Sequence, residues 1–259
     1  MNLNLSNKVI IVTGGAKGIG EGISKVLAKE GAIPVIVGRS KEDNEKTQLE
    51  IQSVGGKAFQ IEAELTKPDE CQKAIALILK EFGRIEGLVN NAGVNDGVGL
   101  ESGNYEKFME SIHKNLVHYY LMAQYALPSL IKSKGSIVNI GSKTAETGQG
   151  NTSAYAAANG GRNALTREWA VELLKYGIRV NAVIVAECFT PLYKSWISTF
   201  PNPEEKLKAI TEKIPLEKRM TTAGEIANMV AFLLSDVSSH TTGQLIHVDG
   251  GYVHLDRAL

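Results

Sequence analysis

Three polar side chains in the segment from Gly135 to Leu165 could act on one substrate oxygen: the hydroxyl of Ser142, the phenol of Tyr155 and the amide of Asn159. Tyr155 and Asn159 are four residues apart, so they share one face of the helix that this segment predicts. Ser142 ends an apolar run that predicts a strand, and it could approach the same point from the other side. Together the three groups could form a proton-transfer site, or merely a hydrogen-bonded helix start.

Strands and helices alternate along almost the whole chain. Apolar runs predict strands at residues 9–12, 33–37, 58–61, 88–91, 137–140, 178–185 and 244–248. Most of these runs are continuously apolar, which is typical of parallel strands covered by helices on both faces of the sheet. Helices are predicted between them, among others at residues 41–54, 105 to about 128 and 153–176. The pattern therefore predicts one α/β domain over residues 1–259, built on a doubly wound, seven-stranded parallel sheet.

One segment, at about residues 187–215, breaks this alternation. It contains several prolines and aromatic residues, including Tyr193 and Trp196. We expect it to form a pair of short helices or a lid that covers the substrate. The two aromatic rings could stack on a bound ligand, although filling the core of the lid is the commoner role for each.

The composition limits the classes of function. Of the 259 residues, 43% are hydrophobic and 22% charged, as in ordinary globular proteins. The 28 basic and 28 acidic residues balance, which argues against binding to nucleic acid or to a membrane surface. Cys71 and Cys188 fit no metal-ligand spacing, and no stretch is typical of a signal peptide or a membrane span. We expect a cytoplasmic protein with no metal site.

Two loops at the ends of predicted strands favour a bound dinucleotide. In such sheets ligands bind beyond the carboxyl ends of the strands. Gly14, Gly18 and Gly20 follow the first strand, where glycines let a pyrophosphate approach the backbone at a helix N-terminus. A glycine-rich turn after a strand is often only a turn. The small polar residues Asn90 to Gly93, directly after the fourth strand, strengthen the cofactor hypothesis.

The ordered set of motifs resembles the short-chain dehydrogenase/reductase (SDR) family. The motifs are TGGAKGIG at residues 13–20, NNAG at residues 90–93, Asn115, Ser142 and Tyr155, and the match covers essentially the whole chain. Within the family, the segments GQGNTSAY, ALTREWAVEL and TPLY and the tail DGGYVHLDRAL look most like bacterial L-fucose dehydrogenases and related sugar dehydrogenases. The resemblance implies a Rossmann fold, a nicotinamide cofactor and oxidoreductase activity.

The resemblance also implies roles for individual residues. Tyr155 would be the general acid/base that exchanges a proton with the substrate, and Ser142 would hydrogen-bond the same oxygen. Asn115 would hold a water in a proton relay, although a helix-interior amide that satisfies the backbone is the alternative. The cofactor would contact Gly14, Lys17, Gly18, Ile19, Gly20, Arg39, Ser40, Glu64, Leu65, Asn90, Ala92, Gly93, Tyr155, Asn159, Cys188 and Thr190.

Position 159 departs from the family pattern, which has a lysine four residues after the tyrosine. In the family that lysine binds the nicotinamide ribose and, by its charge, lowers the pKa of the tyrosine. Asn159 can hydrogen-bond a ribose but supplies no charge. The nearest cations in the sequence are Lys143, expected to point away from Ser142, and Arg162, about two helical turns beyond Tyr155. We expect neither to substitute for the lysine.

The residues after the second strand bear on the choice of cofactor. An acidic residue there would accept hydrogen bonds from the ribose 2′-hydroxyl of NAD, but the chain has Arg39 and Ser40. Arg39 could pair with the 2′-phosphate of NADP, and Lys17 could reach the same group. Two solvated surface cations are the alternative. NADP is therefore favoured, and NAD is not excluded.

Polar residues border the expected crevice, among them Asn95, Lys143, Gln149 and Glu187. A sugar would need such donors and acceptors, because buried hydroxyls left unpaired are unfavourable. We therefore expect an NAD(P)-dependent oxidoreductase that oxidises an L-fucose-like aldose to its lactone. The alternatives are a carbonyl reductase of sugar acids or 3-oxoacyl thioesters and, because of Asn159, a catalytically impaired dinucleotide-binding protein. Family resemblance alone suggests a homotetramer.

Overall fold

Seven parallel strands form one sheet, in the order β3-β2-β1-β4-β5-β6-β7, in the computed structural model, which describes residues 2–256. The strands are β1 (Val9–Thr13), β2 (Ile33–Gly38), β3 (Phe59–Glu62), β4 (Gly87–Asn90), β5 (Ser136–Ser142), β6 (Arg179–Val185) and β7 (Leu245–Val248). The predicted fold class is confirmed. The last three residues of the C-terminal motif, 257–259, lie outside the described residues.

The central strands are buried because both faces of the sheet are covered. All five residues of β1 are buried, and β6 is buried from its second residue onward. Branched apolar side chains suit such strands, and each buried one contributes roughly 1.5–3 kcal/mol relative to exposure. The register pairs Ser142 with Val185, so β5 and β6 end together at the carboxyl edge of the sheet.

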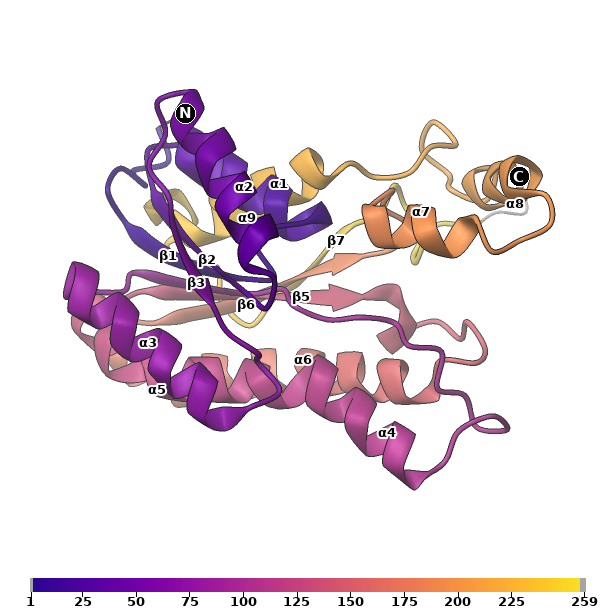
Figure 1. The fold of residues 1–259 in the computed structure, drawn as a ribbon, viewed down its shortest axis with the longest axis horizontal. Helices are drawn as coiled ribbons and strands as arrows, with labels where there is room; N and C mark the ends of the chain where they lie inside the picture. Colours follow the sequence, from indigo (N-terminus) through magenta and orange to yellow (C-terminus); the bar gives the residue numbers. More distant parts are fainter. Residues whose placement is uncertain (1, 257–259) are drawn as a thin grey trace.

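Helices cover both faces of the sheet (Figure 1). One layer contains α1 (Gly18–Lys29), α2 (Lys41–Ser53) and α9 (Ala223–Leu234), and the other contains α3 (Pro68–Phe82), α5 (His118–Ser133) and α6 (Ser153–Glu172). Each layer encloses its own apolar core against the sheet. None of these helices, nor any other in residues 2–256, has the length and apolar character needed to cross a membrane.

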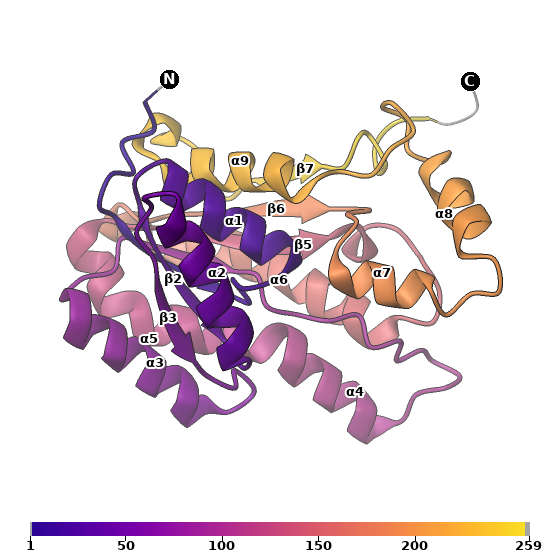
Figure 2. The ribbon, with the colours of Figure 1, turned by 45° about the horizontal axis from the view of Figure 1, so that its top comes forward.

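The remaining helical segments lie mostly toward the carboxyl edge of the sheet. The helix α4 (Tyr105–Ile112) continues into α5 through the π-helical turn η1 (His113–Val117). Short 3₁₀ turns occur at η2 (Lys143–Ala145), η3 (Leu174–Tyr176) and η4 (Asp236–Ser238). Two short helices, α7 (Pro191–Ile197) and α8 (Pro203–Thr211), stand beyond the ends of β5 and β6 (Figure 2). The predicted pair of short helices is confirmed, while their covering of a substrate stays a prediction.

Candidate active site

The glycine-rich loop after β1 has the geometry of an anion cradle. Gly14 and Gly18 have φ values of 62° and 56°, in the left-handed region that favours glycine. A Cβ at Gly20 would lie 2.0 Å from the carbonyl oxygen of Gly14, so only glycine fits where α1 approaches the loop. Lys17 and Ile19 belong to the same loop and helix start. The loop therefore fits a dinucleotide pyrophosphate at the N-terminus of α1.

Asn91 holds this loop to the end of β4. Its side-chain amide donates to the carbonyl oxygen of Thr13 at 2.9 Å, and its backbone N–H donates to the hydroxyl of Thr13 at 2.8 Å. The backbone N–H of Ala92 donates to the same hydroxyl at 3.1 Å. The neighbouring Asn90 is fully buried and donates to Asn139 inside the sheet at 3.0 Å. Asn91 is not among the residues predicted from the sequence, although the motif contains both asparagines.

Thr190 packs against the glycine loop from the start of α7. Its hydroxyl accepts a hydrogen bond from the backbone N–H of Tyr193 and so caps α7. A Cβ at Gly18 would lie 3.0 Å from the Thr190 methyl group, so the cap packs against the glycine loop. Cys188 is nearly buried, and burial raises the pKa of its thiol to about 11. Cys188 is therefore a neutral packing group at this point of the site.

The residues predicted to contact the adenosine half of the cofactor lie around the start of α2 and the loop after β3. Arg39 is exposed, and the Ser40 hydroxyl caps α2 by accepting from the Asp43 backbone N–H. Lys17 pairs with the Asp43 carboxylate at 2.6 Å, and this contact is the main cause of the lowered pKa of Asp43. The Lys17 charge is therefore partly neutralised within the protein. Glu64 accepts hydrogen bonds from Thr66, and Leu65 beside it is buried.

Ser142 and Tyr155 stand where a strand end meets a helix start. Ser142 is the last residue of β5 and caps η2, with its hydroxyl accepting from the backbone N–H of Thr144 at 3.3 Å. Tyr155 is in the first turn of α6 and is partly exposed. Because α6 packs along β5 and η2, both hydroxyl groups belong to the same edge of the sheet. The predicted positions of the strand end and the helix start are confirmed.

Both polar atoms of the Asn159 side-chain amide form hydrogen bonds within the protein. Asn159 is fully buried, and its Nδ2 donates to the backbone carbonyl of Tyr155 at 2.9 Å. Its Oδ1 accepts from Nη1 of Arg162 at 3.0 Å. In this arrangement Asn159 joins Arg162 to the first turn of α6. The predicted contact of Asn159 with the cofactor ribose stays a prediction.

Arg162 lies closer to Tyr155 than its position in the sequence predicts. Side chains in a helix point back toward its N-terminus, and Arg162 reaches back over the preceding turn. Its guanidinium carbon lies 5.9 Å from the centre of the Tyr155 ring and 4.3 Å from that of Tyr119. The expectation that Arg162 is about two turns away is therefore wrong for its charged end.

The π-helical turn η1 provides one backbone acceptor for Arg162 and another for His118. A π-turn breaks the regular ladder of helix hydrogen bonds and is often found at functional sites. Here the Asn115 carbonyl accepts from Nε of Arg162 at 2.7 Å, and the Lys114 carbonyl is 2.9 Å from Nε2 of His118. The Asn115 side chain accepts from the Val94 N–H and donates to the backbone. Its role in a water relay stays a prediction.

His118 is buried beside Arg162, and its lowered pKa makes the free energy of unfolding depend on pH. Burial, and then the charge of Arg162, lower the pKa of His118 to about 3. Unfolding exposes this histidine to water, where its ordinary pKa is about 6.5. Between about pH 6.5 and 3, His118 therefore binds a proton in the unfolded chain but not in the folded chain. The free energy of unfolding falls as the pH drops through this range.

We expect His118 to contribute up to ~1.4 kcal/mol per pH unit to the loss of unfolding free energy below about pH 6. Urea unfolding of wild type and His118→Gln between pH 7 and 5 measures this slope. The variant should have the shallower slope, and His240→Gln, at an exposed position, should keep the wild-type slope. Equal slopes for wild type and His118→Gln would contradict the assignment.

The predicted substrate residues differ in their surroundings. Lys143 and Glu187 are mostly buried and form an ion pair with each other. The Lys143 ammonium also lies 4.0 Å from the centre of the Tyr252 ring. Asn95 and Gln149 are exposed on loops. Tyr193, from α7, has a pKa raised first by burial and then by the Glu187 charge, so its hydroxyl stays neutral.

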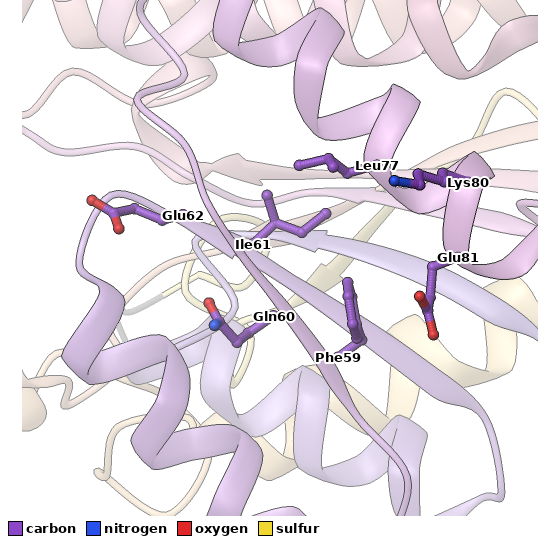
Figure 3. Close-up of a pocket in the computed structure, with 7 residues that line it drawn as sticks. All are labelled: Phe59, Gln60, Ile61, Glu62, Leu77, Lys80 and Glu81. Atoms are coloured by element: carbon purple, nitrogen blue, oxygen red, sulfur yellow. The ribbon is translucent and has the colours of Figure 1, made fainter.

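A separate hollow lies away from this site. A hollow of ≈ 340 Å³ lies between β3 and α3. Its lining residues include Phe59, Ile61 and Lys80 (Figure 3). None of the residues predicted to bind cofactor or substrate lines it. Because β3 is at the edge of the sheet, this hollow is far in the strand order from β5 and its Ser142.

Comparisons with known proteins agree on one family. The family described as "Enoyl-(Acyl carrier protein) reductase" matches residues 14–253. The 3-oxoacyl-[acyl-carrier-protein] reductase FabG of Thermotoga maritima is 34% identical over 252 residues, covering 97% of this chain and 100% of the relative. The L-fucose dehydrogenase of Bos taurus is 31% identical over 252 residues, covering 97% of this chain and 91% of the relative.

A solved structure of a dehydrogenase is also similar over the whole chain. The crystal structure of Cj0485 dehydrogenase is 48% identical in sequence and has a TM-score of 0.94, covering 100% of this chain and 99% of that one. The family resemblance predicted from the motifs is therefore confirmed. The chain belongs to the short-chain dehydrogenase/reductase family of oxidoreductases.

Proposed function

We propose that this protein is an NAD(P)-dependent oxidoreductase that oxidises an L-fucose-like aldose to its lactone. The observation that carries the proposal is the placement of Ser142 and Tyr155 on one edge of the sheet, the carboxyl edge that also holds the glycine loop. The cofactor would lie against Gly14, Gly18 and Gly20, where added Cβ atoms would crowd the loop, and would accept the hydride.

The protein's part in this reaction is to move one proton and to hold the substrate oxygen. In oxidation the phenolate of Tyr155 removes the proton of the sugar hydroxyl, and in reduction the phenol returns it. Ser142 donates a hydrogen bond to the same oxygen as its charge changes. Thr190 and Asn91 keep the nicotinamide side of the loop in place. The substrate carbon then faces the cofactor from a fixed position.

A polar substrate suits the groups around this edge. The Lys143–Glu187 pair offers a donor and an acceptor for sugar hydroxyls, and Asn95 and Gln149 lie on exposed loops. The similarity to an L-fucose dehydrogenase supports a sugar over an apolar substrate. The segment at residues 187–215, with α7 and α8, would cover this substrate.

A panel of substrates tests the proposal. Purified protein with NADP or NAD is mixed with L-fucose, D-arabinose, other aldoses, polyols and ketoses, and reduced cofactor is followed by absorbance. We expect turnover with an aldose of the L-fucose type. If no sugar is turned over with either cofactor, the proposal fails.

A carbonyl reductase of sugar acids or 3-oxoacyl thioesters is the second candidate, and the FabG relative favours it. The exposed apolar side chains of Phe189, Leu192 and Trp196 at the covering segment could contact an acyl chain. Acetoacetyl-CoA with NADPH therefore belongs in the same panel. Binding of the cofactor with no turnover of any compound would support instead the impaired dinucleotide-binding protein that Asn159 suggests.

NADP is the proposed cofactor, with Arg39 as the main contact for its 2′-phosphate, since Lys17 is paired with Asp43. Replacing Arg39 with alanine should raise KM for NADP by about 10- to 100-fold, because a charge-assisted hydrogen bond is lost. KM for NAD should change little. Lys132→Ala, at an exposed position on α5, is the control. Equal effects on the two cofactors would contradict this preference.

We propose that the protein is cytoplasmic and forms a homotetramer. The tetramer is proposed because large apolar side chains remain exposed on α4, α5 and α6. They include Tyr105, Phe108, Tyr120 and Val171, and these helices lie on the same side of the sheet (Figure 1). Light scattering at micromolar concentration should give the mass of four chains. A monomer at that concentration would contradict the assembly.

A further inference from the structure

Among residues 2–256, Arg162 is a buried cation with no carboxylate partner. Its exposed fraction is 3%, and no ion pair joins it to an acid within residues 2–256. Its hydrogen-bond acceptors are neutral: the Asn115 and Ile140 carbonyls and the amide oxygens of Asn115 and Asn159. A guanidinium in such surroundings is unfavourable unless a negative charge forms nearby, so an unpaired buried charge indicates a functional role.

Within residues 2–256, the ionisable groups shown to interact with Arg162 are His118, Tyr119 and Tyr155. The first two, on α5, are buried; burial lowers the pKa of His118 and raises that of Tyr119, so both stay neutral at ordinary pH. The Tyr119 hydroxyl also donates to the Ile140 carbonyl at 3.1 Å. Tyr155, on α6, is the partly exposed member of the three and the one that can exchange a proton with a substrate.

We propose that Arg162 is a positioning residue that stabilises the Tyr155 phenolate through its charge and keeps Asn159 in place. This inference rests on the proposed function, since it concerns the proton that Tyr155 moves. The guanidinium carbon lies 5.9 Å from the Tyr155 ring centre, so the cation stands near the ring whose hydroxyl exchanges the proton. Oxidation, which needs the phenolate, depends on Arg162 more than reduction does.

Two variants distinguish the effect of the Arg162 charge from the effect of its packing. Arg162→Lys keeps the charge, and Arg162→Gln keeps donors for the backbone carbonyls without the charge. The rate constant kcat for oxidation is measured against pH for wild type and both variants, with unfolding midpoints recorded in parallel. We expect Arg162→Gln to lose about 10- to 100-fold in kcat at pH 7 and to need a more alkaline pH for half-maximal kcat. Arg162→Lys should keep a profile near that of wild type.

The outcomes are distinct. No turnover by the wild type would defeat the proposed function itself. Turnover by the wild type with the same pH profile in Arg162→Gln would overturn the role of Arg162, as would matching shifts in both variants. If Arg162→Gln does not fold, a wild-type profile in Arg162→Lys supports the charge, and an alkaline shift in Arg162→Lys overturns it.

A second inference comes from a different part of the molecule. Glu146, after η2, His247, on β7, and His254, in the C-terminal segment, place one ligand atom each within 4.8 Å of one another. Nε2 of His247 is 3.0 Å from the Glu146 carboxylate, and the two imidazole rings meet edge to face at 4.4 Å. Two imidazoles and a carboxylate form a donor set that suits Zn²⁺.

The surroundings of this cluster fit a metal ion as well. The other carboxylate oxygen of Glu146 accepts from Nδ2 of Asn163 at 3.4 Å, so a buried amide orients the first ligand. Glu146, His247 and His254 line an open hollow of ≈ 810 Å³, with Arg167 as the cation among its walls. The hollow leaves room for water or an anion as further ligands. We infer a Zn²⁺ site at Glu146, His247 and His254.

Zinc titration of the untagged protein, in competition with a chromogenic chelator, tests this site. We expect one Zn²⁺ per chain with a micromolar or tighter Kd, weakened at least about tenfold in His247→Ala and in His254→Ala. His240→Ala, at an exposed histidine elsewhere, should bind as wild type does. Binding that is equally tight in His247→Ala, or no binding by the wild type, would overturn the inference.

Discussion

Replacement of Tyr155 with phenylalanine is expected to lower kcat by about 10²- to 10⁴-fold, the range for loss of a general acid/base. The change removes only the hydroxyl, and the ring that faces Arg162 remains. The affinity for NADPH should therefore change little. Steady-state kcat with the best aldose of the panel gives the first quantity, and titration of NADPH fluorescence gives the second.

Tyr105→Phe is the matched control for this variant, since Tyr105 is 74% exposed at the start of α4 and has no role in the proposed site. It should keep the wild-type kcat. Ser142→Ala should lose about 10²- to 10³-fold, as expected for one donor to the reacting oxygen. A loss of less than tenfold in Tyr155→Phe would show that another group moves the proton.

Replacement of Asn159 with lysine is expected to destabilise the protein and to give no gain in kcat. The family pattern suggests the opposite, because it has a lysine at this position. Here Asn159 is fully buried and bonded at 3.0 Å to Arg162, so a second cation would stand beside the first. Two like charges about 4 Å apart repel by up to ~4 kcal/mol at an effective dielectric constant of 20. We expect a loss of about 2–4 kcal/mol in unfolding free energy by urea titration.

Ala157→Lys is the control, since it adds the same charge to the exposed face of α6. Its unfolding free energy should stay near the wild-type value. If Asn159→Lys instead raises kcat at least tenfold with unchanged stability, then the natural site lacks a positive charge, and Arg162 does not supply one.

The sheet and the loops could be predicted from sequence because their signals are local. Continuous apolar runs of four to eight residues between helical segments indicate buried parallel strands, and the runs VIIV in β1 and IPVIV in β2 match this pattern. The glycine loop was also predictable, since the left-handed φ values of Gly14 and Gly18 require glycine. Ser142 followed from its position at the end of a predicted strand, and Tyr155 from the start of the next helix.

The charge distribution of the site could not be predicted, because it depends on side-chain direction and on long-range contacts. Seven residues, about two helical turns, separate Tyr155 from Arg162 and predict that the two are far apart. The long side chain of Arg162 instead points back along α6. The π-turn whose Asn115 carbonyl accepts from Arg162 has no sequence signal of its own. The Lys143–Glu187 pair joins residues 44 positions apart, and the Glu146–His247 contact joins residues 101 positions apart.

A double-mutant cycle between positions 159 and 162 tests most directly whether Arg162 carries the positive charge of this active site. The exchange variant Asn159→Lys/Arg162→Met moves the cation to the position where the family has it. Its kcat for aldose oxidation at pH 7 should exceed that of the single variant Arg162→Met, with a coupling of about tenfold or more, ~1.4 kcal/mol. Strictly additive losses, with the exchange variant slower than both single variants, would contradict the assignment of the charge to Arg162.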